Sequence, residues 1–482
     1  MNKIRFAAVL AALTVGVAAC LAGTGAGAAS ADVAVNGTLF TDPGYDYGAS
    51  IIQIGSVRQY WWCSPGPVNG GASDTIKYRT YNLTTGVYSA IQTVLAPDPT
   101  VATWDKSYIC DPSVIKGAFT DPSNGAKYTY AMYYTATDRG PGSTYSGTTL
   151  DGTNNRIGIA YSNDGTTWSR YSANPVIYPA VFPTDTYGAG QASTYSTNGA
   201  SGLKVFFHDE SSSAGKLVNE RDTTTGTTFG ASTTVSSAGL NADGSAASGN
   251  NPDIAFDQKG QYWYAIWPLA QRPQAGERET YHAVLARMSA ATFPSGNWER
   301  LADVDTNLTG DYLVNNPALV RDQYGNVDPT LPSVEVVYAG GSNDPNDWDL
   351  KSVKWTPPTV GRALSRYYSA SIGKHLVTSG FVPSGYTLES VQGYLSWTRT
   401  SGTVPLYGCL TGTTDRFVSL SSTCEGQYSL GVNGYIWASA PAGVSSSLLY
   451  RCYTGTDHFV STSATCEGQH VDFALGYVRS TP

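Results

Sequence analysis

The chain has 482 residues, 37 of them acidic and 29 basic, and a formal net charge of −8. This balance argues against nucleic acid or an anionic lipid surface as the main partner, because either needs a concentrated basic face. The sequence contains 52 glycines and 33 tyrosines but only 14% charged residues, which is typical of an all-β protein. A chain of this length is too long to fold around one ordinary hydrophobic core, so two domains are expected.

The first residues have the polarity of an export signal. Two basic residues precede an apolar run over residues 6 to about 19, too short to span a bilayer. A lipobox-like sequence would lipidate Cys20, whereas Ala29-Ser30-Ala31 offers an ordinary cleavage site. We predict a signal peptide over residues 1–31 and secretion, with lipid anchoring at the cell surface as the alternative. No later segment is apolar for long enough to be a membrane span.

Five similar units follow the export signal. Each starts with a polar residue and a small residue or proline, continues as an apolar strand, turns and returns as an aromatic strand. The units start at Asp46, Asp111, Gln191, Asn251 and Asn316. Their spacing of about 60 to 80 residues fits a four-stranded blade with its loops. We therefore predict a five-bladed β-propeller as the catalytic domain over residues 36–358.

The residues that start the innermost strands should point into one axial funnel, because these strands converge on the propeller axis. The five starting residues would form a hydrogen-bonding ring suited to sugar hydroxyls. Trp62, Trp104 and the nearby Tyr108 would stack on a sugar face. The alternative is that aspartate or asparagine before proline only caps a turn.

A second repeat, with a period of about 40 residues, begins after Pro357-Pro358. The two cysteine-bearing copies, 406–435 and 449–477, share Leu-Tyr-x-Cys, Phe-Val-Ser, Cys-Glu-Gly and Gly-Tyr, and a cysteine-free copy precedes them. Three copies predict a small β-trefoil-like domain over residues 359–482. It resembles the YR…HF…GY modules appended to secreted bacterial hydrolases. Trp397 and Trp437 favour carbohydrate binding, and the alternative is that these rings fill the domain core.

Cysteine usage agrees with export, because disulfides persist in oxidising compartments. Without Cys20 an even set remains, comprising Cys63, Cys110, Cys409, Cys424, Cys452 and Cys466. The two cysteines of each C-terminal copy have nearly the same spacing, so we pair Cys409 with Cys424 and Cys452 with Cys466. Cys63 and Cys110 then form the remaining pair. No Cys-x-x-Cys motif or histidine cluster suggests zinc, so we predict no metal and no cofactor. Whether a structural Ca²⁺ is bound on the propeller axis stays an open alternative, and no residue pattern indicates one.

The second unit resembles a known family. Its sequence carries Trp104-Asp105, Asp111-Pro112-Ser113-Val114-Ile115, Tyr133-Tyr134-Thr135 and Asn174-Pro175-Val176-Ile177. These motifs resemble blade two of the arabinofuranosidase, xylosidase and arabinanase families and of their fructan-hydrolase relatives. The resemblance implies a base or nucleophile on blade one, an aspartate in the blade-two Asp-Pro motif and a glutamate general acid on blade three. Asp46 matches the first role, with Asp42 as the fallback, and Asp111 matches the second.

Blade three departs from that pattern. The general acid would fall at or near Gln191, and an amide cannot donate and recover a proton at neutral pH. Asp209 and Glu210 end the second strand of this blade, which runs antiparallel to the first and so returns to the funnel face. Glu210 is preferred because glutamate is scarce in the propeller, and Glu220 lies further on. The alternative for Glu210 is a solvated acid in a polar loop.

Together these features predict a secreted, monomeric glycoside hydrolase that cleaves furanosidic or pentose-containing polysaccharide of the arabinan, arabinogalactan or xylan type. Hydrolysis needs one carboxyl with a raised pKa to protonate the leaving oxygen and one ionised carboxylate to activate water or attack carbon. The predicted carboxyl set is Asp46, Asp111 and either Glu210 or Asp209. Gln191 motivates the main alternative, a catalytically silent propeller that binds carbohydrate or acts at the cell surface. A lyase or transferase is the third reading.

Overall fold

The computed structural model is built almost entirely of β-strands. It describes residues 33–66, 73–100, 103–140, 143–145, 148–211, 216–247, 251–271, 280–327, 333–342, 344–356, 361–380, 382–397 and 399–482. The predicted signal peptide, Cys20 and the predicted domain junction at residues 358 and 359 lie outside these ranges. Within them, α-helix is confined to α1 (Thr306–Thr309), and no described helix has the length and apolarity to cross a membrane.

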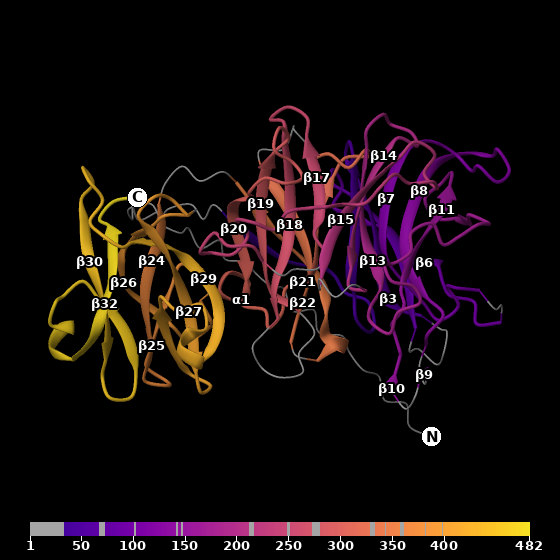
Figure 1. The fold of residues 1–482 in the computed structure, drawn as a ribbon. Helices are drawn as coiled ribbons and strands as arrows, with labels where there is room; N and C mark the ends of the chain where they lie inside the picture. Colours follow the sequence, from indigo (N-terminus) through magenta and orange to yellow (C-terminus); the bar gives the residue numbers. More distant parts are fainter. Residues whose placement is uncertain are drawn as a thin grey trace, which may run out of the picture. The chain divides into compact units, whose positions relative to one another are not determined.

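Three antiparallel sheets of four strands form the middle of the chain (Figure 1). The first contains β7 (Tyr108–Thr120), β8 (Lys127–Thr137), β11 (Arg156–Ser162) and β12 (Ser169–Arg170). The second contains β13 (Ala189–Ser196), β14 (Leu203–Asp209), β15 (Leu217–Thr223) and β16 (Thr233–Thr234). The third contains β17 (Asp253–Asp257), β18 (Tyr262–Gln271), β19 (Thr280–Ser289) and β20 (Glu299–Asp305). A small hairpin, β9 (Thr144–Tyr145) and β10 (Thr148–Thr149), lies outside them.

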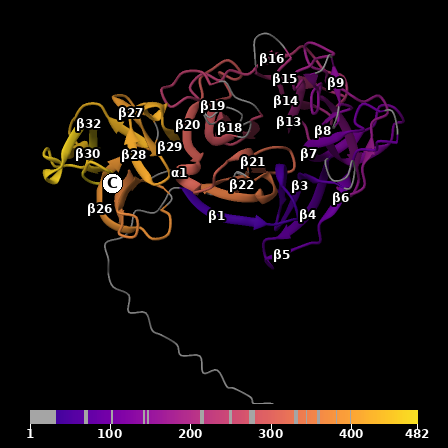
Figure 2. The ribbon, with the colours of Figure 1, turned by 90° about the horizontal axis from the view of Figure 1, so that it is seen from below.

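The strands before and after this middle part share one sheet (Figure 2). The earlier strands are β2 (Tyr47–Ile54), β3 (Val57–Pro65), β4 (Asp74–Asn82), β5 (Val87–Tyr88) and β6 (Gln92–Leu95). The later strands are β21 (Asn315–Arg321), β22 (Val334–Gly340) and β23 (Asp349–Trp355), and β1 (Val33–Phe40) pairs with β23. The innermost strands β2 and β21 meet in a short parallel pairing, Ile51 with Val320 and Ile52 with Arg321. The two ends of this part of the chain therefore close on each other.

Each innermost strand has a residue with positive φ at or near its start. These residues are Gly48 (φ 58), Asp111 (φ 46), Gln191 (φ 56), Asn251 (φ 35) and Asn316 (φ 39). Four of the five predicted starting residues therefore occupy equivalent positions. In the first unit the equivalent residue is Gly48 and not Asp46, so the predicted register of that unit was wrong by two residues. Glycine adopts this conformation without the steric cost that a Cβ imposes.

Apolar side chains pack between neighbouring sheets and form the core of this part. Trp61 of β3 packs in one cluster with Tyr130 and Met132 of β8. Phe206 of β14 and Trp263 of β18 share another, with their ring centroids 5.5 Å apart. Buried aromatic rings contribute large apolar areas, which explains the aromatic second strand that recurs in the sequence.

The C-terminal strands repeat a three-strand pattern. They are β24 (Arg362–Ser369), β25 (Lys374–Thr378), β26 (Thr387–Leu395), β27 (Thr403–Thr411), β28 (Asp415–Ser419), β29 (Tyr428–Trp437), β30 (Ser446–Tyr453), β31 (His458–Ser461) and β32 (His470–Arg479). In each copy the first strand pairs with the second and third strands. Equivalent residues of the copies, such as Leu364, Leu406 and Leu449, share one core. The trefoil assignment stays a prediction.

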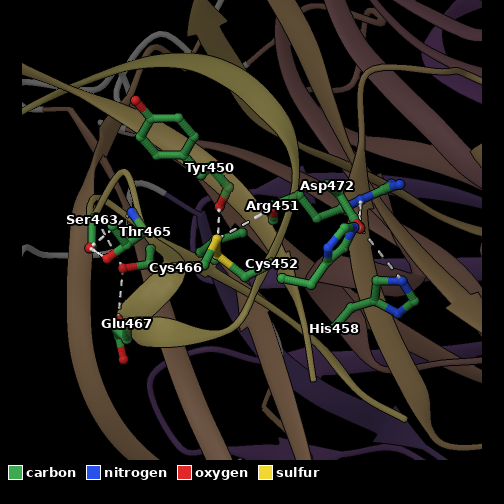
Figure 3. Close-up of a disulfide and its surroundings, with 12 residues drawn as sticks. Tyr450, Arg451, Cys452, His458, Ser463, Thr465, Cys466, Glu467 and Asp472 are labelled. Atoms are coloured by element: carbon green, nitrogen blue, oxygen red, sulfur yellow. Dashed lines mark hydrogen bonds and ion pairs between the residues drawn. A yellow bond between two sulfur atoms is a disulfide. The ribbon is translucent and has the colours of Figure 1, made fainter. Parts of the chain in front are cut away.

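All three predicted disulfides are present. Cys63–Cys110 joins β3 to β7, Cys409–Cys424 lies in the second C-terminal copy, and Cys452–Cys466 lies in the third (Figure 3). Trp397 packs against a core cluster that includes Leu301 and Trp355, and the Arg362 guanidinium lies 4.6 Å from its ring centroid. For Trp397 this placement favours the packing alternative over carbohydrate stacking.

Candidate active site

The positive-φ residues of the innermost strands line one small axial cavity. Its walls include Gly48, Asp111, Gln191, Asn251 and Asn316. The cavity volume is ≈ 40 Å³, which is far below the roughly 300 Å³ at which ligand pockets usually begin. These residues therefore line one common cavity, but the space inside it has room for water and not for a sugar ring.

A second cavity, of ≈ 170 Å³, lies beside the axial one and shares Asp111 with it. It is larger than the axial cavity, although it too is below the roughly 300 Å³ of usual ligand pockets. Its polar lining comes from several sheets and comprises Tyr47, Asp74, Tyr108, Asp111, Thr135, Asn155 and Tyr187. Cys110 also lines it, and the Cys63–Cys110 bond fixes the chain directly before Asp111. Two carboxylates and three phenol groups thus face one cavity, and this is the candidate active site.

Asp111 combines a strained backbone with a buried carboxyl. Its φ is 46°, a region that aspartate tolerates better than most residues. Its Oδ2 accepts a hydrogen bond from the Tyr187 hydroxyl at 3.3 Å. Burial raises the pKa of Asp111 to about 7, although hydrogen bonds from Thr135 and Tyr187 act in the opposite direction and the charge of Asp74 adds to the rise. Near neutral pH this carboxyl therefore holds a proton that it can donate.

Asp74, at the start of β4, has different surroundings. Its Oδ1 accepts a hydrogen bond from the Tyr45 hydroxyl at 2.5 Å, and its Oδ2 accepts one from Tyr47 at 2.9 Å. Burial raises the pKa of Asp74, and the two phenol donors oppose that rise by stabilising the carboxylate. Both carboxyls accept hydrogen bonds from hydroxyl groups, but the bonds to Asp74 are shorter than the 3.3 Å bond from Tyr187 to Asp111. Two neighbouring carboxyls whose environments differ can divide the acid and base roles.

Asp46 does not reach either cavity. Its side chain is fully buried, its Oδ1 accepts a hydrogen bond from Trp62 Nε1 at 2.6 Å, and burial raises its pKa to about 7. The predicted base position of the first unit is held by Gly48, which has no side chain to offer. The fallback Asp42 forms an ion pair with Lys77. Neither aspartate lines the axial cavity or the larger cavity.

The predicted stacking tryptophans are also placed differently. Trp62 has no exposed surface and packs against Phe40, with ring centroids 4.9 Å apart. Trp104 stacks on Tyr134 at 5.6 Å and belongs to neither cavity. Tyr108 lines the larger cavity and not the axial one. The cavity's aromatic surface comes from tyrosines, whose hydroxyls also serve its carboxylates.

The acids of the third unit do not join Asp111 in the cavity. Asp209 is buried and accepts hydrogen bonds from the backbone N–H groups of Ala180 (2.7 Å) and Ser211 (2.8 Å), so it holds a loop in place. Glu210 lies 3.7 Å from Lys216 Nζ, and Glu220 lies 3.0 Å from Lys204 Nζ. The antiparallel strand does return Asp209 to the level of Ala189, but its side chain is committed to structure.

Sequence reasoning missed Asp74, Tyr45, Tyr47 and Tyr187. Tyr45 and Tyr47 flank Asp46, and alternate residues of an extended segment point to the same side. That alternation could have shown that Asp46 points away from its tyrosine neighbours. Asp74 follows a glycine-rich stretch and carries no comparable local signal. It reaches the site only through the pairing of β4 with β3.

Two groups of potential metal donors come together among the described residues. The first is Cys63, Cys110 and Asp111, where both sulfurs are used in a disulfide. The second is His282, Asp303 and Asp305, where the Arg300 guanidinium already binds Asp303. Asp305 in turn accepts hydrogen bonds from two backbone N–H groups. In the second group the carboxylates of Asp303 and Asp305 are therefore bound by Arg300 and by backbone N–H groups.

No family model matches the chain, and no curated protein matches its sequence. Several solved structures have a similar backbone fold. One is a family 117 glycoside hydrolase from the marine bacterium Zobellia galactanivorans. It is 10% identical to this chain, the match covers 67% of this chain and 89% of the hydrolase, and the TM-score is 0.44. The catalytic domain of a Coprinopsis cinerea GH62 alpha-L-arabinofuranosidase is 10% identical over 67% and 98%, with a TM-score of 0.42. An alpha-L-arabinofuranosidase from Lactobacillus brevis is 10% identical over 65% and 93%, with a TM-score of 0.44. Similarities at this level assign neither a substrate nor a residue role.

Proposed function

We propose that this protein is a five-bladed propeller glycoside hydrolase that cleaves furanosidic or pentose-containing polysaccharide, with Asp111 as proton donor and Asp74 as its ionised partner. One observation carries the proposal: two largely buried carboxyl groups line the same cavity, and Asp74 accepts shorter hydrogen bonds (2.5 and 2.9 Å) than Asp111 accepts from Tyr187 (3.3 Å). This pair replaces the predicted set of Asp46, Asp111 and Glu210 or Asp209. Only Asp111 is common to both.

The roles of the two carboxyl groups in hydrolysis follow from the environments of Asp111 and Asp74. Protonated Asp111 gives its proton to the leaving glycosidic oxygen as the bond to the anomeric carbon breaks. Asp74, whose carboxylate form accepts hydrogen bonds from Tyr45 and Tyr47, activates water or attacks that carbon. The tyrosine rings offer flat apolar faces for a sugar, and Tyr187 keeps the Asp111 carboxyl oriented toward the cavity.

The predicted export of the chain supports an extracellular substrate. Three disulfides suit an oxidising compartment, whether the chain is released as a monomer or held by a lipid at Cys20. The C-terminal repeats are proposed to bind carbohydrate and hold the catalytic part near its polymer.

A substrate panel tests the proposal. Purified protein should release reducing sugar from at least one of plant arabinan, xylan, fructan and bacterial arabinogalactan, measured by chromatography of the soluble products. An Asp74→Asn variant should release at least about 10²-fold less, since it lacks one of the two carboxylates. Binding to a polymer without product release from any of the four would refute hydrolysis.

The raised pKa of Asp111 gives the activity a defined pH dependence. With a pKa of about 7, the donor is protonated below that pH and loses its proton above it. We expect kcat/KM to fall about tenfold for each pH unit above 7, because only the acid form reacts. A pH profile of kcat/KM from pH 5 to 9 on the best panel substrate measures this. An alkaline limb with a pKa near 4 would contradict the role given to Asp111.

A second function is favoured by Gly48 and Gln191. These residues stand on the axis where the resembled family would place two of its carboxylates. A propeller that binds carbohydrate without cleaving it would explain both replacements. The panel separates the two functions, because such a protein retains polymer and releases nothing.

A further inference from the structure

In two of the three C-terminal copies, a histidine at the second strand lies between two acids. His375 Nδ1 is 2.6 Å from Asp457, and its Nε2 is 3.4 Å from Glu389. His458 Nδ1 is 2.8 Å from Asp415, and its Nε2 is 3.9 Å from Asp472. Figure 3 shows His458 beside Asp472. In each case one acid comes from a neighbouring copy and the other from the third strand of the same copy.

The middle copy has Arg416 at the histidine position and lacks both acids. Arg416 directly follows Asp415 in the sequence, just as His458 directly follows Asp457, so Arg416 is the equivalent of that histidine. The third-strand acids Glu389 and Asp472 each precede the glycine of their copy's Gly-Tyr motif by the same number of residues. In the middle copy Leu430 stands at that distance before Gly434. Lys374, which precedes His375, holds the position of the neighbouring copy's aspartate. Across the described part of the chain, no carboxylate pairs with Arg416.

Arg416 lies at a cavity of ≈ 580 Å³. Leu430 lines the same cavity, together with Gln427 and Tyr428, so the space opens where the missing acid would stand. Its volume falls within the roughly 300–1,000 Å³ range of ligand pockets. Burial lowers the pKa of Arg416, but a guanidinium stays charged in proteins. A partly buried cation without a counter-charge is costly.

We propose that this cavity binds a uronic acid residue of an acidic polysaccharide, whose carboxylate takes the place of the two absent acids on Arg416. A guanidinium binds a carboxylate through two parallel hydrogen bonds. The Gln427 amide and the Tyr428 ring supply the polar group and the flat surface that a sugar needs. The carboxylate specificity comes from Arg416 alone, whereas the saccharide class rests on the proposed function.

Calorimetric titration of the full chain with digalacturonate tests this site. Wild type should bind digalacturonate and not the neutral digalactose, and Arg416→Gln should bind at least about tenfold more weakly. Arg399→Gln makes the same change at an exposed arginine and should bind like wild type. Lys374→Asp restores an acid at the repeat position and should also weaken binding of digalacturonate.

Three outcomes would overturn the proposal. Equal affinity of wild type and Arg416→Gln would exclude the arginine as the ligand group. Equal competition by acetate or inorganic phosphate would show an adventitious anion only, and tighter binding of a peptide carboxylate would identify a different partner class. Hydrolysis is measured separately, so a protein that binds digalacturonate but cleaves no panel substrate would refute the proposed function and leave this site standing.

Discussion

Replacing Asp111 by asparagine should lower glycoside hydrolysis by about 10²–10⁴-fold, because the amide cannot donate the proton that the leaving oxygen needs. The substitution keeps the size of the side chain, and asparagine tolerates positive φ as aspartate does. The amide oxygen of the variant would still accept the hydrogen bond from Tyr187. The melting temperature should therefore stay close to that of wild type while kcat falls.

Glu210→Gln is the matched control for this prediction. It makes the same change from acid to amide at the residue that the sequence favoured as general acid, and Glu210 lies outside the cavity. We expect its kcat and KM on the best panel substrate to equal those of wild type. If Glu210→Gln abolished activity while Asp111→Asn kept it, the assignment of the site would be reversed.

The repeat pattern located the innermost strands because the same backbone conformation recurs at each of them. Asp111, Gln191, Asn251 and Asn316 all have positive φ, and polar residues that tolerate this conformation mark it in the sequence. In the first unit glycine fulfils the same requirement at Gly48, and a search for polar residues passes over it. The error at Asp46 therefore arose from following side-chain polarity where backbone conformation is the repeated property.

The site was harder to predict than the fold because it depends on pairings between distant strands. Asp111 carries a motif, and the structure places it in the cavity. Asp74 has none, and only the register of β4 against β3 brings it there. Glu210 shows the converse, since its strand ends on the expected side but its side chain lies near Lys216. Strand direction can be inferred from sequence, whereas the direction of one side chain at a strand end cannot.

Replacing Arg321 by methionine should lower the free energy of unfolding by about 3–5 kcal/mol, because it leaves a buried charge without its partner. Arg321 Nη1 lies 2.9 Å from Asp253 Oδ1, and the arginine side chain is 2% exposed. The guanidinium also donates to the Ser193 hydroxyl at 3.2 Å and the Ser50 hydroxyl at 3.4 Å. These contacts join β2, β13, β17 and β21 beside the axial cavity.

Urea unfolding followed by tryptophan fluorescence measures this loss. Arg287→Met removes the half-buried partner of the exposed Glu299 and should cost no more than about 1 kcal/mol. Adding Asp253→Asn to Arg321→Met should recover part of the stability, because the double variant no longer buries an unpaired charge. A loss below about 1 kcal/mol in Arg321→Met would mean that apolar packing between the sheets holds the inner strands together without this ion pair.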